Sequence, residues 1–524
     1  MTPDRVREAR AEPGRFWGYN RRMRRPETLG TLRQAIEAGE VPRRPVKQEL
    51  RDNLLQRLRD DAPLFPGIVG YDETVIPQLV NAVLSKHHFI LLGLRGQAKS
   101  RILRALVTLL DDAVPVVRGC EIHDDPLTPL CSACRRQIAE DGDSVPIDWL
   151  DRETRFVEKL ATPDVTIADM VGDIDPIKAA RAGLGLSDEL TMHYGLLPRA
   201  HRGIFAVNEL PDLAGKIQVG LFNILQEGDV QIKGYPIRLP LDVMMVFTAN
   251  PEDYTARGKI ITPLKDRIGS EIRTHYPMTR HEGMAITEQE AWIGRRPDAT
   301  ATDGIEVPTY VREIVEEVAF LARQDSKIDK RSGVSQRLPI TCLENVVSNA
   351  ERRAALNGES SIVPRVTDIY AALPSITGKF ELEYEGELRG VDAVAHDLIR
   401  GAVANVFGGY IDASDAQQVV EWFDLGGALQ ITDTSSAAEF LTQTDQVQGL
   451  DTLADAIGVK SSAPPPARAS AVDFVLEGLF AQKKITRSDD WCYEAAEHPK
   501  TQLRMEQEFF EEELPGRGKK KYYN

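Results

Sequence analysis

The residues with the clearest chemical meaning form a glycine-bearing loop that ends in lysine and serine, Gly93–Ser100. The apolar run Phe89–Leu92 precedes this loop, and a helical pattern of apolar residues, 102–110, follows it at once. In such a strand–loop–helix unit, successive backbone N–H groups and the helix N-terminus wrap a polyphosphate. Lys99 would reach the outer phosphates, and the Ser100 hydroxyl would bind Mg²⁺. The pattern therefore predicts a nucleoside triphosphate site, with an ordinary glycine turn as the alternative.

Several loop positions are expected to contact the nucleotide. They are Gly93, Arg95, Gly96, Gln97, Ala98, Lys99 and Ser100. Ala98 stands where this motif usually has glycine. A methyl group is tolerable at that position if the backbone angles are right-handed.

A second strand predicted from the sequence, Gly203–Val207, ends in Asn208 and Glu209. In P-loop ATPases such a strand usually ends in Asp and then Glu, where Asp holds the Mg²⁺ shell and Glu polarises the attacking water. Glu209 keeps the second role. Asn208 can accept a hydrogen bond from a metal-bound water but brings no charge, so we expect Mg²⁺ affinity or turnover to be lowered.

The order of these elements resembles that of AAA+ ATPases, and other segments resemble the magnesium chelatase motor subunit and the MoxR-like ATPases in particular. Those segments are 65–70, 194–203 and 228–240. The first is similar to the stretch that lines the adenine pocket, which implies Ile68 and Val69 as nucleotide contacts. The third alternates around a glycine turn, like the β-hairpin that the family inserts before its sensor 1 strand. The resemblance covers roughly residues 60–370.

The resemblance implies roles for three more polar residues. Asn250 follows an apolar strand and matches sensor 1, which holds the lytic water or the γ-phosphate, although a turn-forming Asn before proline is the alternative. Arg267 matches the arginine finger that is offered to the neighbouring subunit, and a surface Asp–Arg pair is the alternative. Arg337 is the candidate for the sensor 2 arginine.

By the same resemblance, the chain is expected to be an ATPase that uses ATP and Mg²⁺ to remodel a client. It would assemble with itself into a ring of six subunits and act with a protein that carries a von Willebrand A domain. One alternative is the motor subunit of a genuine magnesium or cobalt chelatase in tetrapyrrole synthesis. Another is a nucleotide-gated scaffold with little hydrolysis, which Asn208 would suit.

An insert at about 115–160, between the phosphate loop and the acidic strand, contains two pairs of potential metal ligands. Cys120 pairs with His123, and Cys131 pairs with Cys134, each across two intervening residues. Three thiolates and one imidazole could close a tetrahedral structural Zn²⁺ site. Reduced cysteines packed as small apolar groups, or a redox pair, are the alternatives.

Composition limits the class of protein. The chain has 524 residues, 42% hydrophobic and 27% charged, which is typical of a globular protein with several domains. A formal net charge of −16 disfavours general nucleic-acid binding, because phosphate backbones are bound by positive surfaces. The apolar runs are too short to span a membrane, and an arginine-rich beginning without an apolar stretch favours a cytoplasmic location.

The expected fold class is α/β: a P-loop AAA+ core with a parallel sheet flanked by helices, then a helical lid domain and further mainly helical C-terminal segments. The predicted divisions are a helical N-terminal extension (1–60), the nucleotide-binding core (61–277), the lid (278–385), a mainly helical region (386–460), a linker (461–470), and a helical segment with a charged tail (471–524). Three consecutive prolines mark the linker.

Overall fold

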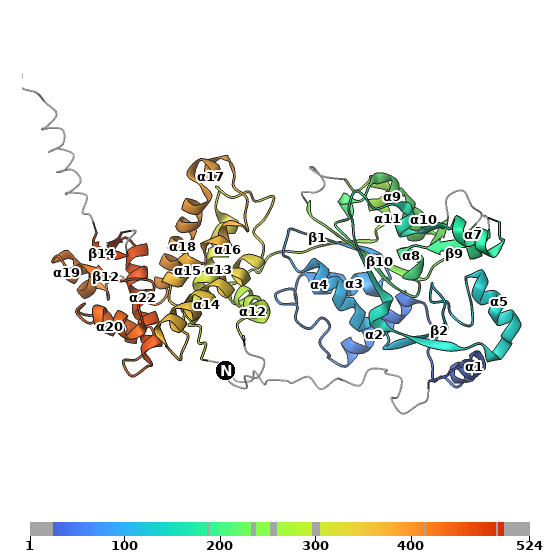
Figure 1. Cartoon of the computed structure of the whole chain (residues 1–524), viewed down its shortest axis with the longest axis horizontal. Coiled ribbons are helices and arrows are strands. Elements are labelled where there is room, and N and C mark those ends of the chain that lie inside the picture. The colour runs from blue at the N-terminus through green and yellow to red at the C-terminus, as the bar shows by residue number, and fades with distance from the viewer. Residues whose placement is uncertain are drawn as a thin grey trace, which may run out of the picture. The chain divides into compact units, whose positions relative to one another are not determined.

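The fold of the chain comes from a computed structural model. It describes residues 25–185, 188–231, 237–251, 259–295, 304–412, 414–488 and 491–496. Two compact units divide the chain, Met1–Tyr276 and Pro277–Asn524 (Figure 1). The first part of the predicted N-terminal extension and nearly all of the charged tail lie outside the described residues.

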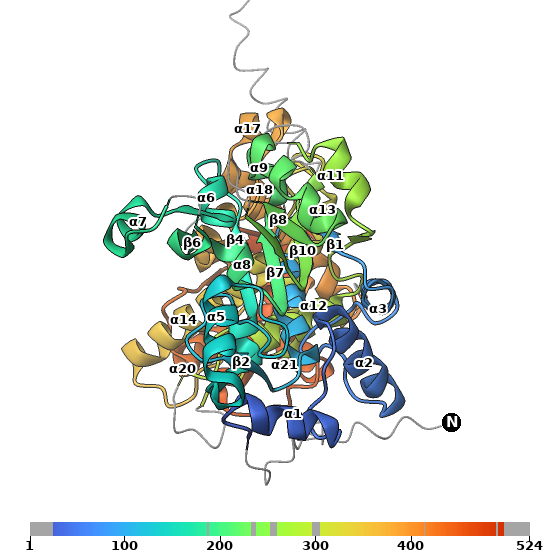
Figure 2. The same cartoon turned by 90° about the vertical axis from the view of Figure 1, so that its right-hand side faces the viewer.

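A five-stranded parallel sheet forms the centre of the first unit. Its order is β11-β1-β10-β7-β4, and strands of this sheet lie side by side in Figure 2. The strands are β1 (Phe89–Leu92), β4 (Phe156–Leu160), β7 (Gly203–Asn208), β10 (Val243–Ala249) and β11 (Ser270–Arg273). Because all five run in the same direction, their carboxyl ends share one edge of the sheet, which is the edge where such sheets bind ligands.

Both faces of this sheet are covered, which explains its continuous apolar strands. Phe89 and Leu91 pack into one apolar cluster with α2 (Val46–Arg59), α3 (Val75–Leu84) and α4 (Lys99–Ala105). Ile90 and Leu92 point to the opposite face and pack into a second cluster. Alternate side chains of β1 thus pack into two different apolar cores, one on each face of the sheet. The predicted α/β class with flanking helices is confirmed.

Three antiparallel strand pairs accompany the main sheet in the first unit. They are β2 (Ala113–Val117) with β3 (Ile147–Asp151), β5 (Gly172–Ile174) with β6 (Met192–Tyr194), and β8 (Asp229–Gln231) with β9 (Arg238–Pro240). The last pair forms the two arms of the hairpin predicted at 228–240, and its turn, 232–236, lies outside the described residues.

The remaining helices of the first unit are short apart from α5. They are α1 (Leu29–Glu37), α5 (Ser132–Asp141), α6 (Ile167–Met170), α7 (Pro176–Ala182), α8 (Leu196–Arg199), α9 (Gly215–Gly220), α10 (Phe222–Gln226) and α11 (Thr262–Arg267). Leu29 and Leu32 of α1, Leu197 of α8 and Ile224 of α10 belong to the second apolar cluster.

The second unit is mainly helical and has one extended apolar core. Its helices are α12 (Arg280–Glu290), α13 (Thr309–Gln324), α14 (Arg337–Asn357), α15 (Thr367–Ala371), α16 (Leu373–Thr377), α17 (Tyr384–Arg389), α18 (Val391–Phe407), α19 (Gln417–Asp424), α20 (Ala437–Thr444), α21 (Leu450–Ala456) and α22 (Pro465–Ala481). A three-stranded antiparallel sheet, absent from the sequence prediction, joins β12 (Leu429–Gln430), β14 (Cys492–Ala495) and β13 (Ile485–Arg487).

The structure corrects the predicted linker at 461–470. Its second half is the start of α22, which begins at Pro465 and has Phe474 and Leu476 fully buried. Proline is favoured in the first turn of a helix, because the N–H that it lacks has no intrahelical partner there. The proline run therefore marks the beginning of a core helix.

Among the described helices, none combines the length and the apolar character that crossing a membrane requires.

Candidate nucleotide site

The loop Gly93–Ser100 joins the carboxyl end of β1 to the start of α4. The Gly93 N–H donates to the Ala249 carbonyl at the end of β10, at 3.1 Å. A Cβ atom at Gly93 would collide with the Thr274 hydroxyl and the Gln97 side chain, and Gly96 has a positive φ of 72°. Both glycines are therefore required by the shape of the loop.

Lys99 lies in the middle of this loop and is only 7% exposed. Its ammonium donates to the carbonyl of Gly93, to the carbonyl of Leu94 at 2.9 Å, and to Oδ1 of Asn250 at 2.7 Å. Ser100 follows as the second residue of α4. The loop thus turns several oxygen atoms toward one cation, at the edge where a phosphate chain would be bound.

Glu209 joins the same group of side chains. Asn250 Nδ2 donates to Glu209 Oε2 at 2.9 Å, and the Glu209 N–H donates to Thr248 Oγ1 at 3.0 Å. Glu209 has a left-handed backbone with φ 55°, which is uncommon for a residue with a side chain. The structure therefore brings the predicted residues Lys99, Asn250 and Glu209 into one hydrogen-bonded chain.

Asn208 is held by two neighbours. Its Oδ1 accepts a hydrogen bond from Thr248 Oγ1 at 3.2 Å, and its Nδ2 donates to the carboxylate of Glu158. Glu158 lies on the adjacent strand β4, and its other oxygen accepts from Arg104 Nε at 2.9 Å. A carboxylate therefore stands beside the position at which the sequence lacks an aspartate. No local motif marks Glu158, because it reaches Asn208 only through strand register.

The backbone at Ala98 does not have the right-handed angles that would accommodate a methyl group without strain. Ala98 precedes α4 with φ 55° and ψ 15°, so it is left-handed. A left-handed residue with a Cβ atom costs roughly 1–2 kcal/mol relative to a right-handed one. The loop accepts this strain because the Ala98 methyl group is exposed.

Aromatic and polar side chains outside the motif hold the loop from its other side. The Tyr71 hydroxyl contacts the carbonyls of Gln97 and His275 at 3.0 and 2.7 Å, and burial raises the pKa of Tyr71, so it remains a donor. Thr274 Oγ1 donates to Gln97 Oε1 at 2.8 Å, and Tyr276 donates to the Arg95 carbonyl at 2.9 Å. These residues come from strand ends and turns with no recognisable motif.

The segment predicted to line an adenine pocket lies just before Tyr71. Ile68 is 9% exposed and packs with the apolar cluster that contains α3 and α4, whereas Val69 is partly exposed. Tyr71 links this segment directly to the phosphate loop. The contact of Ile68 and Val69 with a base stays a prediction.

Comparisons with known proteins identify related sequences. No protein-family model matches the chain. The magnesium-chelatase subunit ChlI of Nostoc sp. is 28% identical over 315 residues, which span 58% of this chain and 80% of the relative. The chloroplastic subunit ChlI of Chlamydomonas reinhardtii is 27% identical over 326 residues, covering 60% of this chain and 74% of the relative. In sequence, the chain is thus similar to the magnesium chelatase I subunit.

A structural comparison aligns the chain with a complex between subunits BchI and BchD of magnesium chelatase. The alignment has a TM-score of 0.31 and 22% identity, and it covers 62% of this chain and 98% of the other.

Arg267, predicted to be an arginine finger, ends α11 and is partly exposed. Its guanidinium donates to Gln226 Oε1 at 3.1 Å and to the Pro263 carbonyl at 2.7 Å, and it stacks over Phe222 at 4.7 Å. None of these contacts involves Lys99 or Glu209.

Arg337 belongs to the second unit, where it is the first residue of α14 and its side chain is exposed. The preceding Gln336 is buried and donates to the Glu316 carboxylate at 2.9 Å. Gln336 therefore anchors the backbone at the start of the helix. The Arg337 side chain that follows it is open to solvent. Its role as a sensor stays a prediction.

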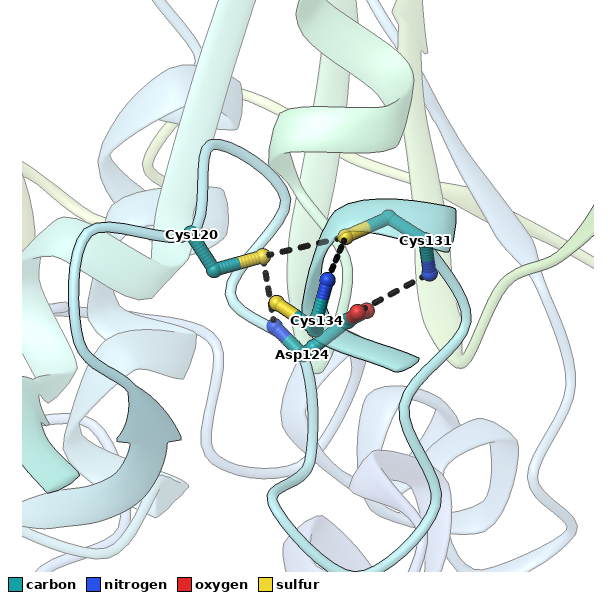
Figure 3. A group of neighbouring side chains, drawn as sticks. All are labelled: Cys120, Asp124, Cys131 and Cys134. Carbon is teal, nitrogen blue, oxygen red and sulfur yellow. Dashed lines mark hydrogen bonds between the residues drawn. The ribbon is translucent and has the colours of Figure 1, made fainter. Parts of the chain in front are cut away.

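The structure corrects the ligand set expected in the cysteine insert. Cys120, Cys131 and Cys134 converge as predicted, but the fourth member of the group is Asp124 (Figure 3). His123 has a left-handed backbone with φ 58°, and its ring contacts the backbone of Arg199. Burial lowers the pKa of His123. The local turn thus directs the carboxylate, and not the imidazole, toward the thiols.

Proposed function

We propose that the chain is an ATP-hydrolysing motor of the magnesium chelatase and MoxR type. The observation that supports this proposal most strongly is the hydrogen-bonded chain of Lys99, Asn250 and Glu209 at the carboxyl edge of the sheet. A phosphate-binding cation, a polar sensor and a carboxylate are the three groups that attack on a γ-phosphate needs, and here they are already adjacent.

In this proposal Lys99 exchanges its carbonyl partners for oxygens of the outer phosphates. Glu209 accepts a hydrogen bond from the attacking water and orients it, while Asn250 keeps the Glu209 carboxylate in place. A positioned base of this kind contributes roughly 10²–10⁴-fold to a rate. The remaining loop residues supply backbone N–H groups to the phosphates.

The residues at this edge suit Mg²⁺, which prefers oxygen ligands and retains several of its waters. Ser100 and Asn208 would hold its shell, and the bound ion would neutralise charge on the phosphates. We propose that Glu158 compensates in part for the uncharged Asn208, because its carboxylate is bonded directly to the Asn208 amide. Arg104 offsets some of this negative charge, so the compensation is incomplete.

The finer features of the motor follow from the family likeness. Subunits would form a ring, with six as the expected number, and Arg267 would reach the site of a neighbouring subunit while Arg337 responds to the nucleotide. A protein with a von Willebrand A domain is the proposed partner, and the cytoplasm is the proposed location. The client remains to be identified.

A second candidate function is metal insertion in tetrapyrrole synthesis. Relatives at 26–28% identity named as magnesium-chelatase subunits support it. Copurification with a large porphyrin-binding subunit would favour this candidate over a remodelling motor. A third candidate, a scaffold that binds ATP with little hydrolysis, is supported by Asn208 alone.

Mixing two inactive variants tests the motor and its shared sites. Lys99→Ala should prevent nucleotide binding in its own subunit, and Arg267→Ala should deprive only the neighbouring subunit of its finger. Each variant alone should be inactive in steady-state phosphate release. Mixed rings should recover part of the activity, because some interfaces then combine an intact Lys99 with an intact Arg267. If activity fails to recover although mixed rings form, a site shared between subunits is wrong.

A further inference from the structure

The cysteine insert contains four potential ligand atoms that are closely grouped. They belong to Cys120, Asp124, Cys131 and Cys134, and all lie within 4.8 Å of one another. Cys120 follows β2, Asp124 lies in the next turn, and the other two cysteines begin α5 (Figure 3). From this geometry we propose that these residues bind one structural Zn²⁺ ion through three thiolates and one carboxylate.

The spacing of the sulfur atoms fits a single ion. Cys120 Sγ and Cys131 Sγ are 4.0 Å apart. Two sulfurs on one tetrahedral Zn²⁺, each at about 2.3 Å, are separated by about 3.8 Å. A disulfide would require about 2.05 Å, and it would leave the third thiol without a partner. The thiols are therefore placed for a shared cation and not for a bond between any two of them.

Asp124 provides the decisive argument against simple apolar packing. Its side chain is 0% exposed, and within the described part of the chain its Oδ1 atom has no hydrogen-bond partner. Its Oδ2 atom accepts a hydrogen bond from the Cys131 N–H, at 2.9 Å. A buried carboxylate oxygen without a partner is costly, and a cation among the thiols would satisfy it.

The surrounding backbone is arranged to stabilise thiolates. The Asp124 N–H donates to Cys120 Sγ at 3.4 Å, and the Cys134 N–H donates to Cys131 Sγ at 3.3 Å. Cys131 is also the N-cap of α5, where the helix dipole favours negative charge. These contacts orient the ligands as hydrogen bonds around metal sites commonly do.

The chemistry of this group selects zinc. Soft thiolates combined with a carboxylate in a four-ligand arrangement suit Zn²⁺, and four protein ligands leave no open position for catalysis. The ion would therefore fasten the insert to the core, since Cys131 and Cys134 are buried in the same apolar cluster as β7 and β10. This role does not depend on ATP binding, so it can fail or hold independently of the proposed motor.

The purified full-length chain, reduced and never exposed to a chelator, tests the proposal by its metal content. Elemental analysis should find one zinc per chain, and Co²⁺ in its place should give thiolate charge-transfer absorption and the strong visible bands of a tetrahedral site. Asp124→Ala should weaken Zn²⁺ binding by roughly 10–100-fold. Wild-type spectra remain informative even if this variant does not fold.

Two variants serve as matched controls. His123→Asn keeps a residue that tolerates the left-handed backbone, and Cys492→Ser removes a thiol in the second unit; both should retain full zinc. A wild-type chain that retains no zinc, with three thiols that react equally with and without added Zn²⁺, would overturn the site. Loss of zinc in His123→Asn but not in Asp124→Ala would overturn the assignment of Asp124.

Discussion

The first unit contains two polar sites that are built in opposite ways. The nucleotide site takes its side chains from several strand ends, so that Lys99 and Asn250 meet across 151 positions of sequence. The cysteine site takes all four ligands from one short insert, and the nearby backbone orients them. The first site requires the whole sheet, whereas the second requires only a local turn and an ion. Mutations should therefore separate activity from local stability.

Replacing Glu209 gives the largest expected effect. Glu209→Gln keeps the hydrogen bond to Asn250 within reach but removes the base, so ATP turnover should fall roughly 10²–10⁴-fold. ATP binding, measured by equilibrium titration, and zinc content should both stay unchanged. Turnover close to that of the wild type would show that Glu209 is not the group that activates water.

Metal removal should act on the two sites in different ways. Prolonged dialysis against EDTA should stop ATP turnover and also lower the free energy of unfolding, by about 4 kcal/mol if zinc was present at a thousand times its Kd. Adding Mg²⁺ should restore turnover, and only Zn²⁺ should restore stability, as followed by thermal unfolding. Full recovery of stability with Mg²⁺ alone would contradict the separation of the two sites.

Glu158 offers a finer test of the nucleotide edge. Glu158→Gln removes a charge but preserves shape, so the Mg²⁺ concentration that gives half-maximal turnover should rise several-fold, since losing about 1 kcal/mol of attraction to a nearby carboxylate weakens binding about fivefold. The control is Glu153→Gln, which removes a carboxylate that is largely exposed on the surface. Equal Mg²⁺ dependence in the two variants would remove Glu158 from the proposal.

The smallest expected effect is at Ala98. Ala98→Gly relieves left-handed strain but increases the entropy of the unfolded chain, so the free energy of unfolding should rise by less than about 1 kcal/mol. The matched change Ala105→Gly, at a right-handed position with φ −64°, should instead destabilise by roughly 1 kcal/mol. Denaturant titrations should show a higher free energy of unfolding for Ala98→Gly and a lower one for Ala105→Gly. Destabilisation by both would contradict the left-handed angle at Ala98.

The convergence of Lys99, Asn250 and Glu209 at the carboxyl edge of the sheet was predictable because its signals are local. Apolar strands ending in polar residues predicted β7 and β10, and parallel pairing then brings Glu209 and Asn250 together. Glu158 was not predictable, because it contacts Asn208 only through the register of β4 with β7. Register depends on the packing of whole strands and not on any short motif.

Other differences have equally specific causes. The spacing of the cysteine insert suggested His123 as the fourth metal ligand. The backbone at His123 is left-handed, and Asp124 lies beside the thiols instead. Proline composition suggested a linker, although Pro465 begins a buried helix. The strands β13 and β14 have three and four residues. Strands this short do not show a recognisable alternation of apolar and polar residues in the sequence.

The most direct test of the central claim is steady-state phosphate release by the wild-type chain, measured against protein concentration in samples that also report ATP binding. If the chain is a motor that works as a ring, its specific activity should rise with protein concentration as subunits assemble. The wild-type chain should also bind ATP, and Lys99→Ala should abolish this binding. Tight ATP binding with no turnover at any concentration would contradict the motor and would favour the nucleotide-gated scaffold.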